Sequence, residues 1–205
     1  MAAGRRILLA YLVYYAALGA LFPYLPVYLR ELGLTFEQIG LLTAVQAAIQ
    51  LALAPVWGGL ADRFPRTRVT LPLAALVAAA GAAVMFLASD FSAVLIGSLI
   101  LFGGSAGIAP TLDARTLETL GPSQRGRFGE VRAFGSLAFV ASTVALGFVL
   151  DADGARSLFW VYVPFLIATA IVTAAIPRHG TTRSVNLLRG AGDFRPWTGW
   201  TQGTF

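Results

Sequence analysis

The sequence predicts an all-α membrane protein with six transmembrane helices. Of its 205 residues, 57% are hydrophobic and only 12% are charged, and the mean hydropathy is +0.74. Ordinary soluble domains are far less apolar. The apolar residues also gather in six runs that contain no charged side chain, most of them close to the roughly 20 residues that a helix needs to cross a bilayer.

The six runs cover residues 7–29, 38–61, 69–89, 91–112, 133–150 and 157–177. Each is expected to be helical, because backbone polar groups in lipid must find their hydrogen bonds within the segment. The fifth run is short and can extend into its flanks. Gly103 and Gly107 form a small-residue face that favours close helix packing. Five prolines are candidates for kinks: Pro23, Pro26, Pro55, Pro72 and Pro164.

Arginine residues, the only basic side chains besides one histidine, predict the orientation. If the N-terminus is cytoplasmic, only Arg30 and Arg156 lie outside, and Arg132 lies near a membrane boundary. The positive-inside rule therefore predicts a multi-pass protein of the cell (inner) membrane with both termini in the cytoplasm. The predicted cytoplasmic arginines are Arg5, Arg6, Arg63, Arg66, Arg68, Arg115, Arg125, Arg127, Arg178, Arg183, Arg189 and Arg195.

The composition argues against several classes of protein. The chain has no cysteine, and its one histidine, His179, follows the last apolar run, so metal and catalytic-triad chemistry have almost no ligands. No phosphate-binding loop is present. The arginines lie in short loops between apolar runs, which does not indicate a nucleic-acid surface. We therefore expect no metal, no cofactor, no nucleic-acid partner and no enzymatic activity.

Two parts of the chain differ in composition. Residues 1–178 hold all six apolar runs and are predicted to form one six-helix bundle. Residues 179–205 mix Gly, Arg, Thr and Trp without a further apolar run, which is typical of a flexible segment. We interpret this second part as a cytoplasmic tail or the start of a central linker.

The loop after the second apolar run carries a motif. It contains Gly58, an Asp62-Arg63 pair three residues beyond Gly59, and the further arginines Arg66 and Arg68. This loop resembles the signature cytoplasmic loop of the major facilitator superfamily, although Pro65 stands where that family usually has glycine. The resemblance implies a conformational latch in which the aspartate accepts hydrogen bonds from neighbouring helix ends. The alternative is that these arginines only set the topology.

A second motif opens the fifth apolar run. Residues 128–135 follow the pattern Phe-Gly-x-x-Arg-x-Phe-Gly, and Pro110-Thr111-Leu112-Asp113 closes the fourth run. The pattern is similar to that of the lactose permease-like sugar and nucleoside proton symporters, and the chain also resembles the phenylpropionate permease group. The resemblance gives Arg132 the place of an arginine that binds sugar and a carboxylate. Asp113 takes the place of that carboxylate, one carbon shorter than the usual Glu.

The physical cost of charge in a membrane supports a function for this pair. A carboxylate and a guanidinium at membrane depth each cost several kcal/mol unless they are paired or hydrated, so they usually mark a path for substrate or ions. The planar fork of Arg132 can hold the carboxylate of Asp113 and still donate to a substrate. The alternative is that both lie at the level of the headgroups, with Arg132 snorkelling to water.

Two further sets of polar side chains are candidates for lining a cavity. Tyr11, Tyr14 and Tyr15 follow helical spacing on the first run, and Gln46 and Gln50 do so on the second. Buried amides without a partner are costly, so the glutamines are expected to face the cavity or a neighbouring helix. Packing between helices is the alternative for all of them. We take Tyr11, Tyr14, Gln46 and Gln50, together with Asp113 and Arg132, as the predicted substrate-binding residues.

The resemblance covers about residues 7–177 and implies a function. Superfamily members have two six-helix bundles, each a 3+3 inverted repeat, around a central cavity that opens alternately to either side. The chain is therefore expected to be the N-terminal half of a secondary transporter that takes up a sugar, nucleoside or aromatic acid with protons and needs a second bundle. We expect a truncated product, or else a fragment or a half that pairs. The rival hypothesis is a non-transporting helical bundle that binds a partner.

Overall fold

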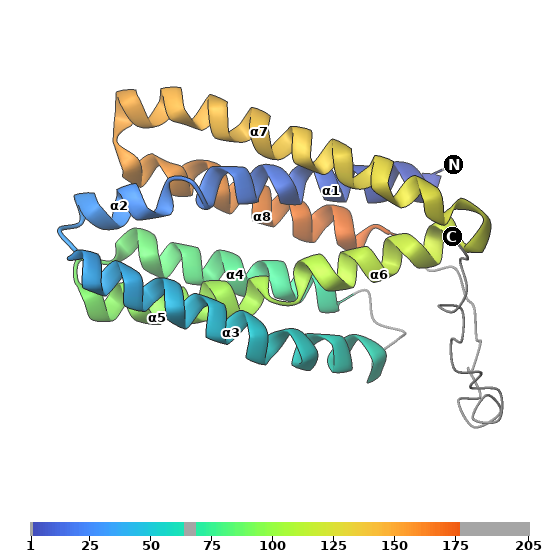
Figure 1. Cartoon of the computed structure of the whole chain (residues 1–205), viewed down its shortest axis with the longest axis horizontal. Coiled ribbons are helices and arrows are strands. Elements are labelled where there is room, and N and C mark those ends of the chain that lie inside the picture. The colour runs from blue at the N-terminus through green and yellow to red at the C-terminus, as the bar shows by residue number, and fades with distance from the viewer. Residues whose placement is uncertain (1, 64–68, 177–205) are drawn as a thin grey trace, which may run out of the picture.

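The computed structural model describes residues 2–63 and 69–176, and these residues form one bundle of long helices (Figure 1). Within them, six helical segments are long and apolar enough to cross a membrane, which confirms the predicted number of spans. The helices are α1 Ala2–Leu21, α2 Leu25–Glu31, α3 Phe36–Arg63, α4 Thr70–Leu87, α5 Phe91–Ser105, α6 Ile108–Leu120, α7 Phe128–Asp153 and α8 Leu158–Ala174. Short 3₁₀ turns, η1 Pro122–Arg127 and η2 Ala155–Ser157, flank α7.

Side-chain hydrogen bonds cap the N-termini of α3 and α5. Thr35 and Gln38 form a capping box at the start of α3: the Thr35 backbone N–H donates to Gln38 Oε1 at 2.9 Å, and the Gln38 N–H donates to Thr35 Oγ1 at 3.3 Å. The Asp90 carboxylate caps α5 by accepting a 2.8 Å hydrogen bond from the Ala93 N–H. These contacts satisfy donors that have no partner within the helix.

The first and fourth spans are each broken into two helices. Pro23 lies in the turn between α1 and α2, where its missing N–H does not interrupt a ladder. The fourth span breaks between α5 and α6 at Ala106 and Gly107, without a proline. Pro55 and Pro164, in contrast, lie inside α3 and α8.

The predicted end of the fourth span is wrong, whereas the expected extension of the short fifth run is confirmed. The fifth span extends over Phe128–Asp153, well beyond the apolar run at 133–150, and the fourth continues to Leu120 instead of ending at residue 112. Both helices contain charged residues near their ends, and a search for uncharged apolar runs excludes those residues. Asp113 therefore lies inside helix α6 and not at the end of a span.

The packing pattern relates the first three spans to the last three. α1 packs chiefly against α7 and α8, while α5 packs chiefly against α4 and α3, and α4 contacts α8 between the two groups. The first span thus packs on the fifth and sixth spans, and the fourth span packs in the same way on the second and third. The pattern is that of a 3+3 repeat, as predicted.

Glycines permit the closest helix contacts. A Cβ atom at Gly81 in α4 would lie 2.6 Å from Leu101 Cα in α5, and one at Gly104 would lie 2.7 Å from the Ala74 carbonyl oxygen. The predicted packing role of Gly103 and Gly107 is confirmed, because they face side chains of α3. Close packing of this kind drives helix association where lipid removes the hydrophobic effect.

Two spans remain largely uncovered. About half of the apolar window is buried in the first, third, fourth and sixth spans, but only 6% in α3 and 11% in α7. Large apolar side chains on α7 stay exposed, among them Phe134, Leu137, Val144 and Phe148. Lipid or another protein must therefore cover these two helices in a membrane.

Contacts at the two ends of the bundle fix how the loops are arranged. Arg6 Nη1 in α1 donates to the Ala175 carbonyl oxygen just after α8 at 2.7 Å, so α1 begins where α8 ends. At the other end, Glu31 Oε2 accepts a 3.0 Å hydrogen bond from the Ala155 N–H. The loops that follow α2 and α7 therefore lie together.

Candidate functional site

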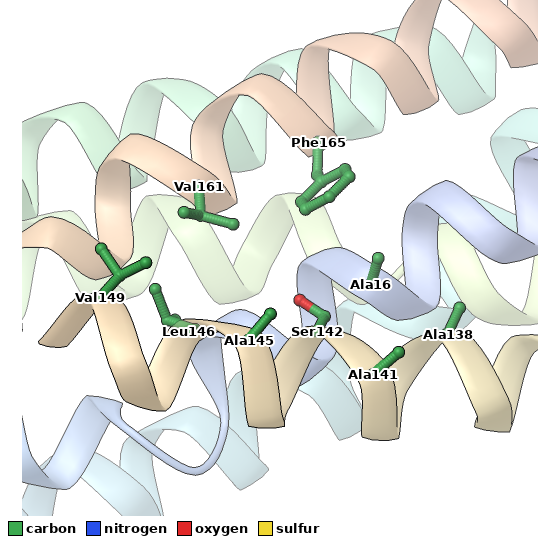
Figure 2. A pocket seen from close by; sticks show the side chains of 9 residues that line it. All are labelled: Ala16, Ala138, Ala141, Ser142, Ala145, Leu146, Val149, Val161 and Phe165. Carbon is green, nitrogen blue, oxygen red and sulfur yellow. The ribbon is translucent and has the colours of Figure 1, made fainter.

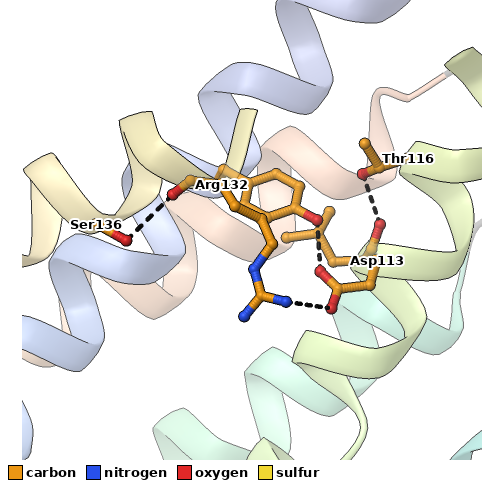
Figure 3. Close-up of polar contacts among 6 residues, drawn as sticks. Asp113, Thr116, Arg132 and Ser136 are labelled. Carbon is orange, nitrogen blue, oxygen red and sulfur yellow. Dashed lines mark hydrogen bonds and ion pairs between the residues drawn. The ribbon is translucent and has the colours of Figure 1, made fainter. Parts of the chain in front are cut away.

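A polar cluster joins α1, α6 and α7 (Figure 3). The Tyr11 hydroxyl donates a 2.5 Å hydrogen bond to Asp113 Oδ1. Arg132 Nη1 lies 3.8 Å from the other carboxylate oxygen, Oδ2. The structure thus brings together three residues that the sequence predicted as substrate-binding, from three different helices.

Neighbouring hydroxyl groups are occupied within their own helices. Thr116 Oγ1 donates to the Leu112 carbonyl oxygen at 2.7 Å, and Ser136 Oγ donates to the Arg132 carbonyl oxygen at 3.3 Å (Figure 3). Such bonds to the preceding turn are the usual choice for hydroxyls inside a membrane helix. These two hydroxyl groups therefore do not donate to the Asp113 carboxylate.

Exposure differs strongly across the cluster. Tyr11 is fully buried, whereas 29% of the Asp113 side chain and 52% of the Arg132 side chain are exposed. A separation of 3.8 Å is an electrostatic contact and is too long for a hydrogen bond. The guanidinium also lies 5.8 Å from the Phe128 ring centroid. Arg132 therefore keeps donor groups for a ligand while it neutralises Asp113.

An aromatic stack supports the cluster from α1. The rings of Tyr11 and Tyr15 stack with centroids 5.8 Å apart and an angle of 15°. Gly135 in α7 makes room for them, since a Cβ atom there would lie 3.0 Å from Tyr15 Cδ2. No role was predicted for Gly135, and Tyr15 was predicted only as a candidate for lining a cavity. The second glycine of the Phe-Gly-x-x-Arg-x-Phe-Gly pattern was the available signal.

The other predicted substrate-binding residues do not join this cluster. Tyr14 is buried and makes an edge-to-face contact with Tyr15. Gln46 and Gln50 lie partly exposed on α3, which packs mainly on α5. They follow the same helical stripe as Trp57, whose ring packs beside Gly107. Their role as cavity-lining residues stays a prediction.

The predicted latch falls mostly outside the described residues. Arg66 and Arg68 lie in the undescribed segment 64–68, and Asp62 is in α3 but its side chain is not among those described. Arg63 is exposed at the last position of α3, and no atom lies within 4 Å of a Cβ placed on Gly58. The latch therefore stays a prediction from the sequence.

A separate groove of about 390 Å³ runs between α7 and α8 over α1 (Figure 2). Carbon atoms line nearly all of it. Ser142 supplies the one hydroxyl, and this oxygen is the buried side-chain polar atom without a hydrogen bond in the described part of the chain. Such a lining offers little to a polar solute. The remaining lining residues are Ala16, Ala138, Ala141, Ala145, Leu146, Val149, Val161 and Phe165.

Comparison with known proteins finds transporters. The chain is 33% identical over 173 residues to a maltose permease of Geobacillus stearothermophilus, covering 83% of this chain and 43% of that protein. It is 27% identical over 178 residues to the quinolone resistance protein NorA of Staphylococcus aureus, covering 85% and 45%. It is 24% identical over 182 residues to the uncharacterized transporter YwbF of Bacillus subtilis, covering 88% and 45%.

The chain spans less than half the length of these curated relatives. A family model described as the MFS_1 like family matches residues 5–191, which include all six spans. The match agrees with the helical bundle and with the 3+3 packing of its spans. The chain therefore belongs to the MFS_1-like family of the major facilitator superfamily and has the architecture of one six-helix half.

Proposed function

We propose that this bundle forms one half of a secondary active transporter and contributes a site for a small polar solute. The observation that carries the proposal is the Asp113–Arg132 pair, held by Tyr11 and yet partly exposed. An ionisable pair inside a membrane bundle is costly and usually functional. The curated relatives carry the names permease, transporter and resistance protein.

Charge balance favours a neutral solute. The charges of Asp113 and Arg132 offset each other, so the pair leaves no net charge for an ion. It still presents donors on Arg132 and an acceptor on Asp113, which suits the hydroxyl groups of a sugar or nucleoside. The relative named maltose permease supports a sugar. An aromatic acid is the weaker candidate, because the pair has no uncompensated cation while Asp113 is ionised.

A second six-helix bundle is the proposed partner. The weakly buried helices α3 and α7 flank the bundle and offer their apolar faces for packing (Figure 1). The curated relatives are more than twice the matched length, which leaves room for another bundle of this size. The cavity would form between the two halves, with alternating access by rocking of one half against the other.

Proton coupling is the proposed source of energy. Asp113 is an acid that faces an arginine inside the bundle, so its protonation would remove the ion pair and change which conformation is favoured. The arginine distribution favours an orientation in the cell membrane with both termini in the cytoplasm. Uptake would then follow the inward proton gradient.

Transport in proteoliposomes tests the proposal. The chain is reconstituted alone and together with the C-terminal half of the Geobacillus stearothermophilus maltose permease, and radiolabelled maltose, uridine and phenylpropionate are offered with and without an imposed proton gradient. We expect gradient-dependent maltose uptake only with both halves present, and its loss in Arg132→Ala. Failure of every solute, with both halves inserted and associated, would favour the non-transporting bundle.

A further inference from the structure

Tyr11 differs from the other residues of the cluster because it has no exposed surface. Its ring lies against Tyr15, and its hydroxyl is directed at Asp113 Oδ1. A fully buried ring cannot lie against a solute unless the bundle rearranges. The sequence predicted Tyr11 as a substrate-binding residue, but its burial favours an indirect role.

The two oxygens of the Asp113 carboxyl have different partners. Oδ1 accepts the 2.5 Å hydrogen bond from Tyr11, while Oδ2 lies 3.8 Å from Arg132 Nη1. The first contact is short and part-buried, and the second is long and joins two side chains that are partly exposed. Arg132 lies too far from Oδ2 to donate a hydrogen bond, so a proton that arrives from water meets Oδ2 more readily than Oδ1, which already accepts the Tyr11 hydrogen bond.

We propose that Tyr11 is a positioning residue that holds Asp113 Oδ1 and thereby directs protonation to Oδ2, releasing Arg132. The proton comes from bulk water and forms an O–H bond at Oδ2. The ion pair with Arg132 is lost, and the hydrogen bond from Tyr11 to Oδ1 remains. The freed guanidinium can then turn to the solute. This inference rests on the proposed proton-coupled function and deepens it.

The surroundings of Asp113 are consistent with this assignment. Tyr11 from α1 and Arg132 from α7 both contact its carboxyl. Tyr15 and Tyr14 lie one turn further along α1 and pack on each other. Tyr15 is also wedged against Gly135. Because the ring of Tyr11 stacks on Tyr15, its hydroxyl has little freedom to leave Asp113.

Infrared difference spectroscopy of the purified full chain in lipid nanodiscs tests the proposal. Spectra at acidic and neutral pH report the C=O stretch of each carboxyl that gains a proton, and Asp113→Asn identifies the Asp113 band by its loss. In Tyr11→Phe the band is expected at a higher frequency, because the C=O at Oδ1 has lost its hydrogen-bond donor. A merely structural role for Tyr11 would not produce this shift.

Tyr28→Phe is the matched control. Tyr28 is also buried and also donates a 2.5 Å hydrogen bond. Its acceptor is the backbone carbonyl oxygen of Met85 in α4, which is not one of the three helices of the cluster. This variant should leave the Asp113 band unchanged. If Tyr11→Phe does not fold, 3-fluorotyrosine at position 11 replaces it. The fluorinated phenol is a stronger donor and should move the band to a lower frequency.

Three results would overturn the proposal. An unchanged band in Tyr11→Phe would show that Tyr11 does not hold the protonated carboxyl. An equal shift in Tyr28→Phe would show a general loosening of the bundle. The absence of any band that Asp113→Asn removes would show that Asp113 does not take up a proton. The proposed transport function fails separately, through absent uptake in proteoliposomes.

Discussion

The indole nitrogen of Trp57 in α3 donates a 2.7 Å hydrogen bond to the carbonyl oxygen of Gly103 in α5. The same indole ring lies against Gly107, one turn further on, where a Cβ atom would lie 2.7 Å from Trp57 Cβ. Few other contacts hold α3, which is the least buried span. This contact therefore decides how α3 is attached to the rest of the bundle.

Gly107→Leu should detach α3. A leucine side chain overlaps the Trp57 ring, and overpacking of this kind typically costs about 1 to 3 kcal/mol. We expect a lower midpoint of thermal unfolding in detergent and faster proteolysis near α3. Gly40→Leu in α3 is the control, since nothing lies within 4 Å of its Cβ position. Equal stability of the two variants would contradict the attachment described here.

Asp113→Ala should destabilise the chain more than Arg132→Ala. Removing the carboxylate leaves the buried Tyr11 hydroxyl without its acceptor, which costs about 1 to 3 kcal/mol. Removing Arg132 leaves Asp113 its hydrogen bond from Tyr11 and its partial exposure, so the loss should be smaller. Chemical unfolding of the purified chain measures both differences.

The double variant Asp113→Ala with Tyr11→Phe isolates this hydrogen bond. Since both polar partners are then absent, most of the stability lost in Asp113→Ala should return. Additive losses would show that the buried hydrogen bond is not the cause.

Reporter fusions test the predicted orientation. Fusions after Arg68 and Arg183 should report the cytoplasm, and fusions near Glu31 and Asp153 should report the opposite side, because of the arginine asymmetry. The hydrogen bond from the Ala155 N–H to Glu31 already places those last two loops at one end of the bundle. A periplasmic signal after Arg68 would reverse the proposed topology.

Asp62→Asn tests the predicted latch in the paired two-bundle protein. If the carboxylate accepts hydrogen bonds that stabilise one conformation, uptake should fall about 5- to 150-fold, the range of a coupling of about 1 to 3 kcal/mol. Membrane insertion and the amount of folded protein should stay normal. Uptake at the rate of the unmodified protein would show that the loop only sets topology.

Hydropathy alone determined the number of spans and their order. Six apolar runs must become six helices, because lipid leaves the backbone no other hydrogen-bond partners. The same measure ended the fourth span too early, and it did not show how far the short fifth run extends into its flanks. Charged residues such as Asp113, Glu130 and Arg132 can continue a helix as long as their side chains reach water or a partner, and hydropathy does not register this.

Residue types and spacing identified Asp113 and Arg132, because opposite charges are rare in apolar sequence and fit a known pattern. Only the tertiary structure decided which tyrosine forms a hydrogen bond with this pair. Tyr11, Tyr14 and Tyr15 look alike in the sequence, yet the packing of α1 against α6 and α7 directs just the Tyr11 hydroxyl to Asp113, 102 residues away. The physical reason is that a contact between helices depends on their relative rotation and closeness. Those in turn depend on small residues such as Gly135, whose effect appears only when the helices meet.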